Sequence, residues 1–393
     1  MDNGALYRDV LERAHAVADK LHESTTQNNP RQQTMSRPVC VIAEAGVNHN
    51  GDIDLAFELV DAAVGAGADV IKFQSFCAAK LVSATAPKAA YQIERTGAQE
   101  NQRDMLERLE LSTEQQRALW QRCRDRDIEF LSTPFDDDSL KFLVADLVLG
   151  TIKIGSGDLT NAPLLLEVAR SGVQVILSTG MGTLAEVEEA LGVLAFGYLG
   201  TGEPVRRSDF AHALHAPQAW DLLRERVTLL HCTSEYPAPV ASSNLRVMAT
   251  LSAAFGMRVG YSDHTDGMAV SLGAVALGAE VIEKHLTIDR TLPGPDHAAS
   301  MTPPEFAELV SGIRAVSASL GTGVKQPSAE EVANRGIGRK SLHVARDLEA
   351  GHELAAADLR VMRPGSGRSP MHWWDSVGTR LPEAVRACEP LSA

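Results

Sequence analysis

Residues 258–285 read RVGYSDHTDGMAVSLGAVALGAEVIEKH, and this stretch contains the repeating unit of the fold. Two short apolar runs, at 258–261 and 280–282, flank a segment of helical period at 267–277. A strand, a helix and a second strand in this order are typical of a βαβ unit with two parallel strands. Ionisable residues follow both runs: Asp263 and His264 after the first, Glu283 and His285 after the second.

The same alternation extends from residue 38 to about residue 320. The other predicted strands lie at 39–43, 69–73, 128–132, 151–154, 173–177 and 227–230. Further helices are predicted at 55–64, 113–124, 164–171, 184–194 and 304–320. Eight strands, each followed by a helix within about 280 residues, favour a closed (β/α)8 TIM barrel over an open doubly wound sheet.

The regions outside this alternation have a different composition. Residues 23–37 are polar and without pattern, so we expect a flexible N-terminal extension at 1–36. The 393 residues then divide into a catalytic TIM-barrel domain at 37–322, a linker rich in Gly and polar residues at 323–336, and a small β-rich domain. That last domain is predicted at 337–393 from its short β-like runs and its Pro- and Gly-rich turn.

The composition excludes several classes of function. Apolar residues make up 44% and charged residues 22% of the chain, as in soluble globular proteins. The net charge of -14 argues against nucleic-acid or anionic-membrane partners, so local positive charge must hold any anionic substrate. Five cysteines without CxxC spacing indicate reduced thiols. Since no signal peptide or membrane span is recognisable, we expect a cytoplasmic protein.

Polar residues follow nearly every predicted strand, and in a parallel barrel these strand ends meet in one pocket. Lys72 and Lys153 each end an apolar run and are candidates for binding an anion. Hydroxyl groups of Thr133, Ser156 and Ser178 would complete a cradle for phosphate and carboxylate. Structural ion pairs, or a Schiff-base lysine of the aldolase kind, are the alternatives.

His264 and His285 are the candidate metal ligands, because they follow adjacent strands and imidazole suits divalent ions. Asp263 and Glu283 are expected to orient the two rings. The alternative is a pair of hydrogen-bonded structural histidines. Glu44, in the segment AEAGVNHNG, is a candidate catalytic residue at the barrel mouth, or else a buried partner of Lys72.

Nine motifs stand in order at these predicted strand ends: EAGVNHNGD, IKFQS, STPF, KIGSGD, ILSTGM, LLHCTSEYPAP, GYSDHT, EKHLT and PGPDH. This set resembles the bacterial sialic acid synthase family, which includes N-acetylneuraminate, legionaminate and pseudaminate synthases. The resemblance covers residues 38 to about 320. It continues through 335–393, where RPGSGRSPM is similar to the turn of the family's antifreeze-like (SAF) domain.

The resemblance implies a condensation of phosphoenolpyruvate with an open-chain aldose such as N-acetylmannosamine, with C–O cleavage and release of phosphate. It implies Mn2+ or Mg2+ as the cofactor, bound by His264 and His285. Glu44, Lys72 and Lys153 would be catalytic. The phosphoenolpyruvate site would comprise Lys72, Thr133, Lys153, Ser156 and Ser178. The implied sugar-binding residues are Asp158, Ser234, Tyr236, Asp296 and Arg363.

Arg363 would reach the active site of another subunit, which implies a domain-swapped homodimer. Asp158 and Ser234 depart from the family, which often has Glu and Asn at these positions. These departures leave the aldose open, between N-acetylmannosamine, a 2,4-diacetamido-trideoxyhexose and an unusual aldose.

Three rival functions remain. A synthase for a phosphorylated aldose, as in the Kdo-8-phosphate or DAHP families, needs basic groups that the strand ends do not supply beyond Arg363. A Schiff-base aldolase would form a borohydride-trappable adduct. A non-catalytic carbohydrate-binding protein has no need for the glutamate, lysines and histidines together.

Overall fold

The computed structural model describes residues 38–88, 92, 93, 95, 101–200 and 202–392. The predicted extension at 1–36 lies outside the described residues. The chain divides into two compact units, Met1–Leu320 and Gly321–Ala393. Each unit is described below by itself.

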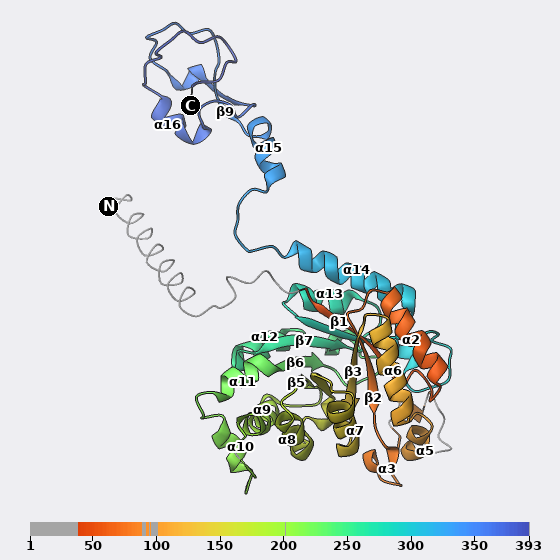
Figure 1. Cartoon of the computed structure of the whole chain (residues 1–393). Helices are drawn as coiled ribbons and strands as arrows, with labels where there is room; N and C mark the ends of the chain where they lie inside the picture. Colours follow the sequence, from red (N-terminus) through yellow and green to blue (C-terminus); the bar gives the residue numbers. More distant parts are fainter. Residues whose placement is uncertain (1–37, 89–91, 94, 96–100, 201, 393) are drawn as a thin grey trace. The chain divides into compact units, whose positions relative to one another are not determined.

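The first unit is built around a sheet of eight parallel strands (Figure 1). They are β1 (Cys40–Gly46), β2 (Val70–Ser75), β3 (Glu129–Pro134), β4 (Thr151–Ile154), β5 (Gln174–Ser178), β6 (Val227–Cys232), β7 (Arg258–Asp263) and β8 (Val281–His285). Their hydrogen-bonded order is β3-β2-β1-β8-β7-β6-β5-β4. Because β3 and β4 at the two ends of this order also contact each other, the sheet curves into a near-closed barrel. This confirms the predicted fold.

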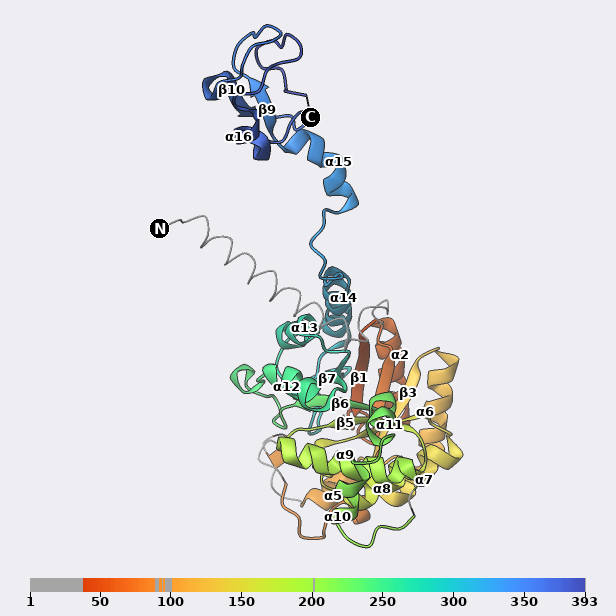
Figure 2. The same cartoon turned by 90° about the vertical axis from the view of Figure 1, so that its left-hand side faces the viewer.

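Helices surround the strands in both views (Figures 1 and 2). Those following successive strands are α2 (Ile53–Gly65), α6 (Thr113–Asp125), α7 (Asp137–Lys141), α8 (Ala162–Arg170), α9 (Leu184–Leu199), α12 (Arg246–Phe255), α13 (Ala269–Ala276) and α14 (Pro303–Ser319). Shorter helices occupy the connections: α3 (Ala78–Leu81), α5 (Gln102–Glu107), α10 (Ser208–Ala213) and α11 (Ala219–Arg226). The sequence patterns did not predict these four. No helix within the described part of the chain combines the length and apolarity needed to span a bilayer.

Side chains alternate between the two faces of each strand. Outward-facing residues such as Ile71, Ile152 and Leu229 join the large apolar core beneath the helices. Inward-facing residues such as Ile42 and Leu230 form a smaller apolar cluster inside the barrel. Since successive side chains of a strand point to opposite faces, the residue two positions after each inward apolar residue also faces the barrel interior. This two-residue period places the candidate site in the barrel interior, directly above the smaller apolar cluster.

Helix boundaries follow from local capping. Helix α9 begins with a capping box, in which Thr183 and Glu186 bond each other's backbone amides. It ends at Gly200, whose φ of 65° is left-handed. Ser112 and Gln115 form the corresponding capping box of α6.

The second unit contains the antiparallel pair β9 (Ser341–Val344) and β10 (Leu359–Met362), with helices α15 (Ala329–Gly338) and α16 (Trp373–Ser376). Seven buried apolar residues form its core: Leu342, Val344, Leu348, Leu354, Leu359, Leu381 and Leu391. Asp358 is also buried, and it accepts hydrogen bonds from Arg346 and His352. The unit therefore has a small core of its own.

Close packing inside the barrel makes Gly260 of β7 sensitive to substitution. A Cβ at this position would lie 2.5 Å from the Val281 carbonyl oxygen and 2.6 Å from Leu230 Cδ2. We expect Gly260→Val to lower the free energy of unfolding by roughly 1–3 kcal/mol through overpacking, as measured by urea denaturation. Gly150→Ala is the control, because a Cβ there meets nothing within 4 Å. Equal stability of the two variants would contradict this account of the interior.

Candidate active site

Four ionisable side chains occupy the layer above the apolar cluster inside the barrel. They are Glu44 on β1, Lys72 on β2, Lys153 on β4 and Glu283 on β8, and all four are buried. Each stands at an inward-facing position of its strand, closer to the carboxyl end than the apolar cluster. Burying charges is costly unless they are paired, so their mutual contacts decide what the site can bind.

Lys72 lies between two carboxylates. Its Nζ is 2.9 Å from Glu44 Oε2 and 3.5 Å from Glu283 Oε2. It also donates a hydrogen bond of 3.3 Å to the hydroxyl of Thr133 on β3. Burial acts to lower the pKa of Lys72, but Glu283 and Glu44 outweigh it and the pKa is raised. Lys72 is therefore a permanently charged ammonium group at the barrel mouth.

Lys153 faces Lys72 across Glu283. Its Nζ lies 3.7 Å from Glu283 Oε1 and donates a hydrogen bond of 2.7 Å to Ser178 Oγ on β5. Burial lowers the pKa of Lys153, and Glu283 offsets only part of that effect. Glu283 thus contacts both lysines, whereas Glu44 is paired with Lys72.

The two carboxylates differ in their protonation. Burial raises the pKa of Glu44 to about 7, since Lys72 compensates only in part. Burial also raises the pKa of Glu283, but Lys153 and Lys72, with a hydrogen bond from Ser262, bring it down to about 2. Glu283 is therefore the permanent counter-ion, and Glu44 is the group that exchanges a proton near neutral pH.

Hydroxyl and thiol groups line the side of the site beside Lys153. Ser156 Oγ lies 3.0 Å from Cys232 Sγ and accepts a hydrogen bond of 3.0 Å from the Gly180 amide. A Cβ on Gly180 would lie 2.5 Å from Ser234 Oγ and 2.8 Å from Ser156 Oγ, so a larger residue here would displace these hydroxyl groups. Cys232 and Ser234 also line a cavity of about 590 Å³ at the barrel mouth.

The two candidate metal ligands lie side by side. The rings of His264 and His285 are 5.4 Å apart between centroids, and the Tyr236 ring lies 4.2 Å from that of His264. His264 Nδ1 makes a 2.7 Å hydrogen bond with the Thr233 carbonyl oxygen, so Nδ1 carries the proton and Nε2, which lies 3.5 Å from Ser262 Oγ, keeps its lone pair. His285 Nδ1 is buried and has no hydrogen-bond partner among the residues that the structure describes.

Two neutral imidazoles fit a divalent cation. Burial lowers the pKa of His264, and burial together with His264 and Lys72 lowers that of His285 well below its usual range. Neutral rings keep the lone pairs that metal binding requires. In the described residues, no three His, Cys, Asp or Glu side chains gather as a complete ligand set. The protein would thus supply two ligands and leave the remaining positions to substrate and water.

The candidate sugar-binding residues lie in several loops. Asp296 follows β8, and burial raises its pKa to about 6, although Lys72 acts in the opposite direction. Asp158 is half-buried after β4 and accepts a hydrogen bond from Asn161. Tyr236 and Ser234 follow β6. Arg363 belongs to the second unit, where it follows β10 and is exposed.

Two strand-end residues face away from the pocket. Asp263 does not contact either histidine ring: it accepts hydrogen bonds from Thr265 and Ser271 outside the barrel. Asp263 therefore does not orient the rings through a direct hydrogen bond. His231 likewise faces the helices, where its Nε2 hydrogen-bonds the Ser243 carbonyl oxygen. Glu283 does face inward, yet its ion pairs and its hydrogen bond join it to the lysines and Ser262 rather than to the imidazoles.

Three inward-facing residues were missed from the sequence. Gln74 donates a hydrogen bond of 3.2 Å to Glu44 Oε1, Ser262 donates one of 2.8 Å to Glu283 Oε1, and Cys232 contacts Ser156. Gln74 stands two residues after Lys72, and Ser262 two residues before His264. Strand periodicity applied outward from each candidate would have identified both.

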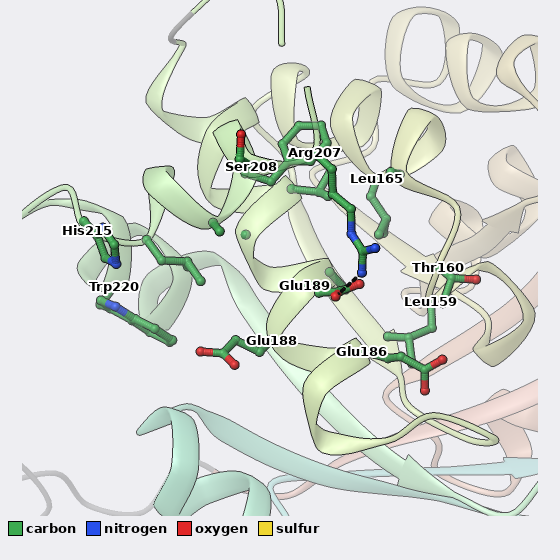
Figure 3. A pocket seen from close by; sticks show the side chains of 17 residues that line it. Leu159, Thr160, Leu165, Glu186, Glu188, Glu189, Arg207, Ser208, His215 and Trp220 are labelled. Carbon is green, nitrogen blue, oxygen red and sulfur yellow. Dashed lines mark hydrogen bonds and ion pairs between the residues drawn. The ribbon is translucent and has the colours of Figure 1, made fainter. Parts of the chain in front are cut away.

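A larger cavity of about 990 Å³ lies outside the barrel, between α8, α9 and α10 (Figure 3). Its lining is mostly apolar, with Glu186, Glu188 and Glu189 along α9. Figure 3 shows Arg207 and Glu189 pointing toward each other in an ion pair. None of the candidate site residues lines it, so the chemistry belongs to the barrel mouth.

Comparison with known proteins agrees with this geometry. Residues 59–325 match the NeuB family and residues 339–393 match the SAF domain. The N,N'-diacetyllegionaminic acid synthase of Campylobacter jejuni is 43% identical over 338 residues, covering 86% of this chain and 94% of that protein. The synthase of the same name from Legionella pneumophila is 43% identical over 352 residues, covering 90% and 92%.

A solved structure is also similar. The crystal structure of N-acetylneuraminic acid (sialic acid) synthetase from Leptospira borgpetersenii, in complex with citrate, has 34% identity and a TM-score of 0.60. The match covers 76% of this chain and 90% of that one. The expectation of an enzyme is confirmed, since these relatives are named synthases. The chain belongs to the NeuB family and has a SAF domain at its C-terminal side.

Proposed function

We propose that this protein condenses phosphoenolpyruvate with a 2,4-diacetamido-trideoxyhexose in its open-chain form, using a divalent metal ion bound by His264 and His285. The observation that carries the proposal is the buried pair Lys72 and Lys153, which share the single permanent counter-ion Glu283. A ligand with both phosphate and carboxylate groups matches two ammonium groups with surrounding hydroxyls. The two relatives at 43% identity support the choice of the diacetamido sugar.

The reaction follows from the chemistry of an enol phosphate. The C2–C3 π electrons of phosphoenolpyruvate form a bond to the aldehyde carbon, whose oxygen takes up a proton. Water adds to the cationic C2 and gives a proton to Glu44, the candidate base. The bond between C2 and the phosphate-bearing oxygen then breaks while the new C2 hydroxyl gives its proton to the departing phosphate, which leaves a 2-keto acid. Glu44 returns its proton to solvent, which balances the proton taken up by the aldehyde oxygen. A divalent ion at the imidazole pair supplies Lewis-acid polarisation when bound.

The chain's own residues govern the other steps. Lys72 and Lys153 hold the phosphate and carboxylate charge through the reaction. Gln74, through its hydrogen bond to Glu44 Oε1, orients the base. Asp296, Tyr236, Asp158 and Ser234 are the proposed sugar contacts. The proposal also includes a domain-swapped homodimer, in which Arg363 of one chain contacts the sugar bound by another.

The test of the function is phosphate release from phosphoenolpyruvate across a panel of aldoses. We expect release to require both an aldose and Mn2+ or Mg2+, to be fastest with the diacetamido-trideoxyhexose, and to stop when a chelator is added. N-acetylmannosamine and its 6-phosphate are the comparison sugars. Faster release with the 6-phosphate would instead support a synthase for phosphorylated aldoses. No release from folded, metal-loaded protein with any of these sugars would contradict the proposal.

Lys153→Met tests the anion cradle. Loss of the ammonium group removes the charge that faces the phosphate and leaves Glu283 with one cation. We expect turnover to fall by about 100-fold or more, measured as phosphate release at saturating aldose. Lys141→Met, at an exposed position of α7, is the matched control and should retain full activity. Near-normal turnover in Lys153→Met would reject the assignment.

The pKa of Glu44 predicts a pH dependence. Glu44 faces Lys72 and Gln74 from β2 and Glu283 and His285 from β8. Since its carboxylate form is the base, kcat/KM should rise with pH through about 7 as the proton leaves.

Glu44→Gln should lose most activity and this limb of the pH profile. Asp296→Asn is the control for the neighbouring buried carboxyl: it should weaken aldose binding but keep the limb. Residual activity of Glu44→Gln with an unchanged limb would show that another group is the base.

A further inference from the structure

We propose that Asp263 and Lys284 are positioning residues for the metal site, which hold the backbones of β7 and β8 so that His264 and His285 stand at the separation one divalent ion requires. The inference rests on the metal site of the proposed function. Both side chains face away from the candidate substrate pocket, so any effect on the site must pass through the residues beside them on β7 and β8.

The register of the sheet connects the two pairs. Asp263 on β7 is the direct partner of Lys284 on β8. Because side chains alternate along a strand, this pair points outward, whereas Ser262 and Glu283 one step earlier point inward. His264 and His285, one step later, point inward again. The outward ion pair and the inward imidazole pair are thus carried by consecutive residues of the same two strands.

The ion pair is buried and fully engaged. Lys284 Nζ lies 3.1 Å from Asp263 Oδ2, and the two side chains are 3% and 0% exposed. Ser271 of α13 donates a hydrogen bond of 2.5 Å to the same carboxylate oxygen. The pair therefore joins β7, β8 and the following helix at one point.

The contacts continue past His264. Lys284 Nζ donates a hydrogen bond of 2.7 Å to the Thr265 carbonyl oxygen. The Thr265 amide and hydroxyl each donate one of 2.8 Å to Asp263 Oδ1. His264 is therefore held on both sides by residues that belong to this cluster. The Thr233 carbonyl oxygen then fixes the rotation of its ring.

The chemistry of the pair favours positioning over stability. A buried ion pair contributes little net stability, because desolvation offsets the attraction. It does impose directional contacts, since an ammonium group needs its acceptors at defined places. An apolar pair of similar volume would fill the space but leave the Thr265 carbonyl oxygen without its donor.

The experiment measures Mn2+ binding to the metal-free protein by electron paramagnetic resonance, without substrate. Variants are Asp263→Asn, Lys284→Met and the double variant, which has no unpaired buried charge. We expect each to bind Mn2+ about 10- to 100-fold more weakly than the wild-type protein. The spin-echo modulation from imidazole nitrogen should be weakened at matched occupancy.

Two controls separate positioning from general destabilisation. Arg314→Met breaks an ion pair with Asp69 on another part of the barrel and should leave Mn2+ affinity unchanged. His285→Ala should abolish the tight site. Wild-type affinity and modulation in the folded double variant would overturn this inference while leaving the proposed metal site intact. Failure of the wild-type protein to bind Mn2+ would overturn the metal site and this inference together.

Discussion

Two buried ammonium groups share one buried carboxylate inside this barrel, and the rest of the site is arranged around that shortage of negative charge. Glu283 lies within 3.7 Å of both Lys72 and Lys153. Glu44 is the second carboxylate, but burial raises its pKa to about 7 and it is only partly ionised at neutral pH. A protein with a net charge of -14 thus contains a local excess of positive charge where its candidate substrate would bind.

The barrel stabilises these buried charges because neighbouring strands bring their inward-facing residues to the same level. Lys72 and Thr133 come from adjacent strands, as do Lys153 and Ser178, and each lysine donates to its neighbour's hydroxyl. The apolar cluster of Ile42 and Leu230 lies below and excludes water from that side. Charge, hydrogen bonding and solvent exclusion therefore follow from the same two-residue period.

That period also explains what could be predicted from sequence. The eight strands were recognisable as short apolar runs, and Lys72, Lys153, His264 and His285 as polar residues where those runs stop. The patterns did not reveal which face of a strand each residue takes, so Asp263 was expected beside the two histidine rings and Gln74 was overlooked. Short helices such as α10 and α11 were missed because they interrupt a long connection. The identity of the substrates came from the resemblance to known synthases, because residue types and spacing indicated an anion site and a metal site but not which molecules bind there.

The order of the strands has a mechanical consequence. Ladder hydrogen bonds join every neighbouring pair except β3 and β4, which stand at the two ends of the hydrogen-bonded order among the described strands. Thr133 lies on one of these strands and Lys153 on the other. The two sides of the anion cradle therefore meet where, among the described strands, two neighbouring strands are in contact without ladder hydrogen bonds. An anion that contacts both Thr133 and Lys153 would hold β3 and β4 together at this point. The distance between these two strands would then depend on the bound ligand as well as on the backbone.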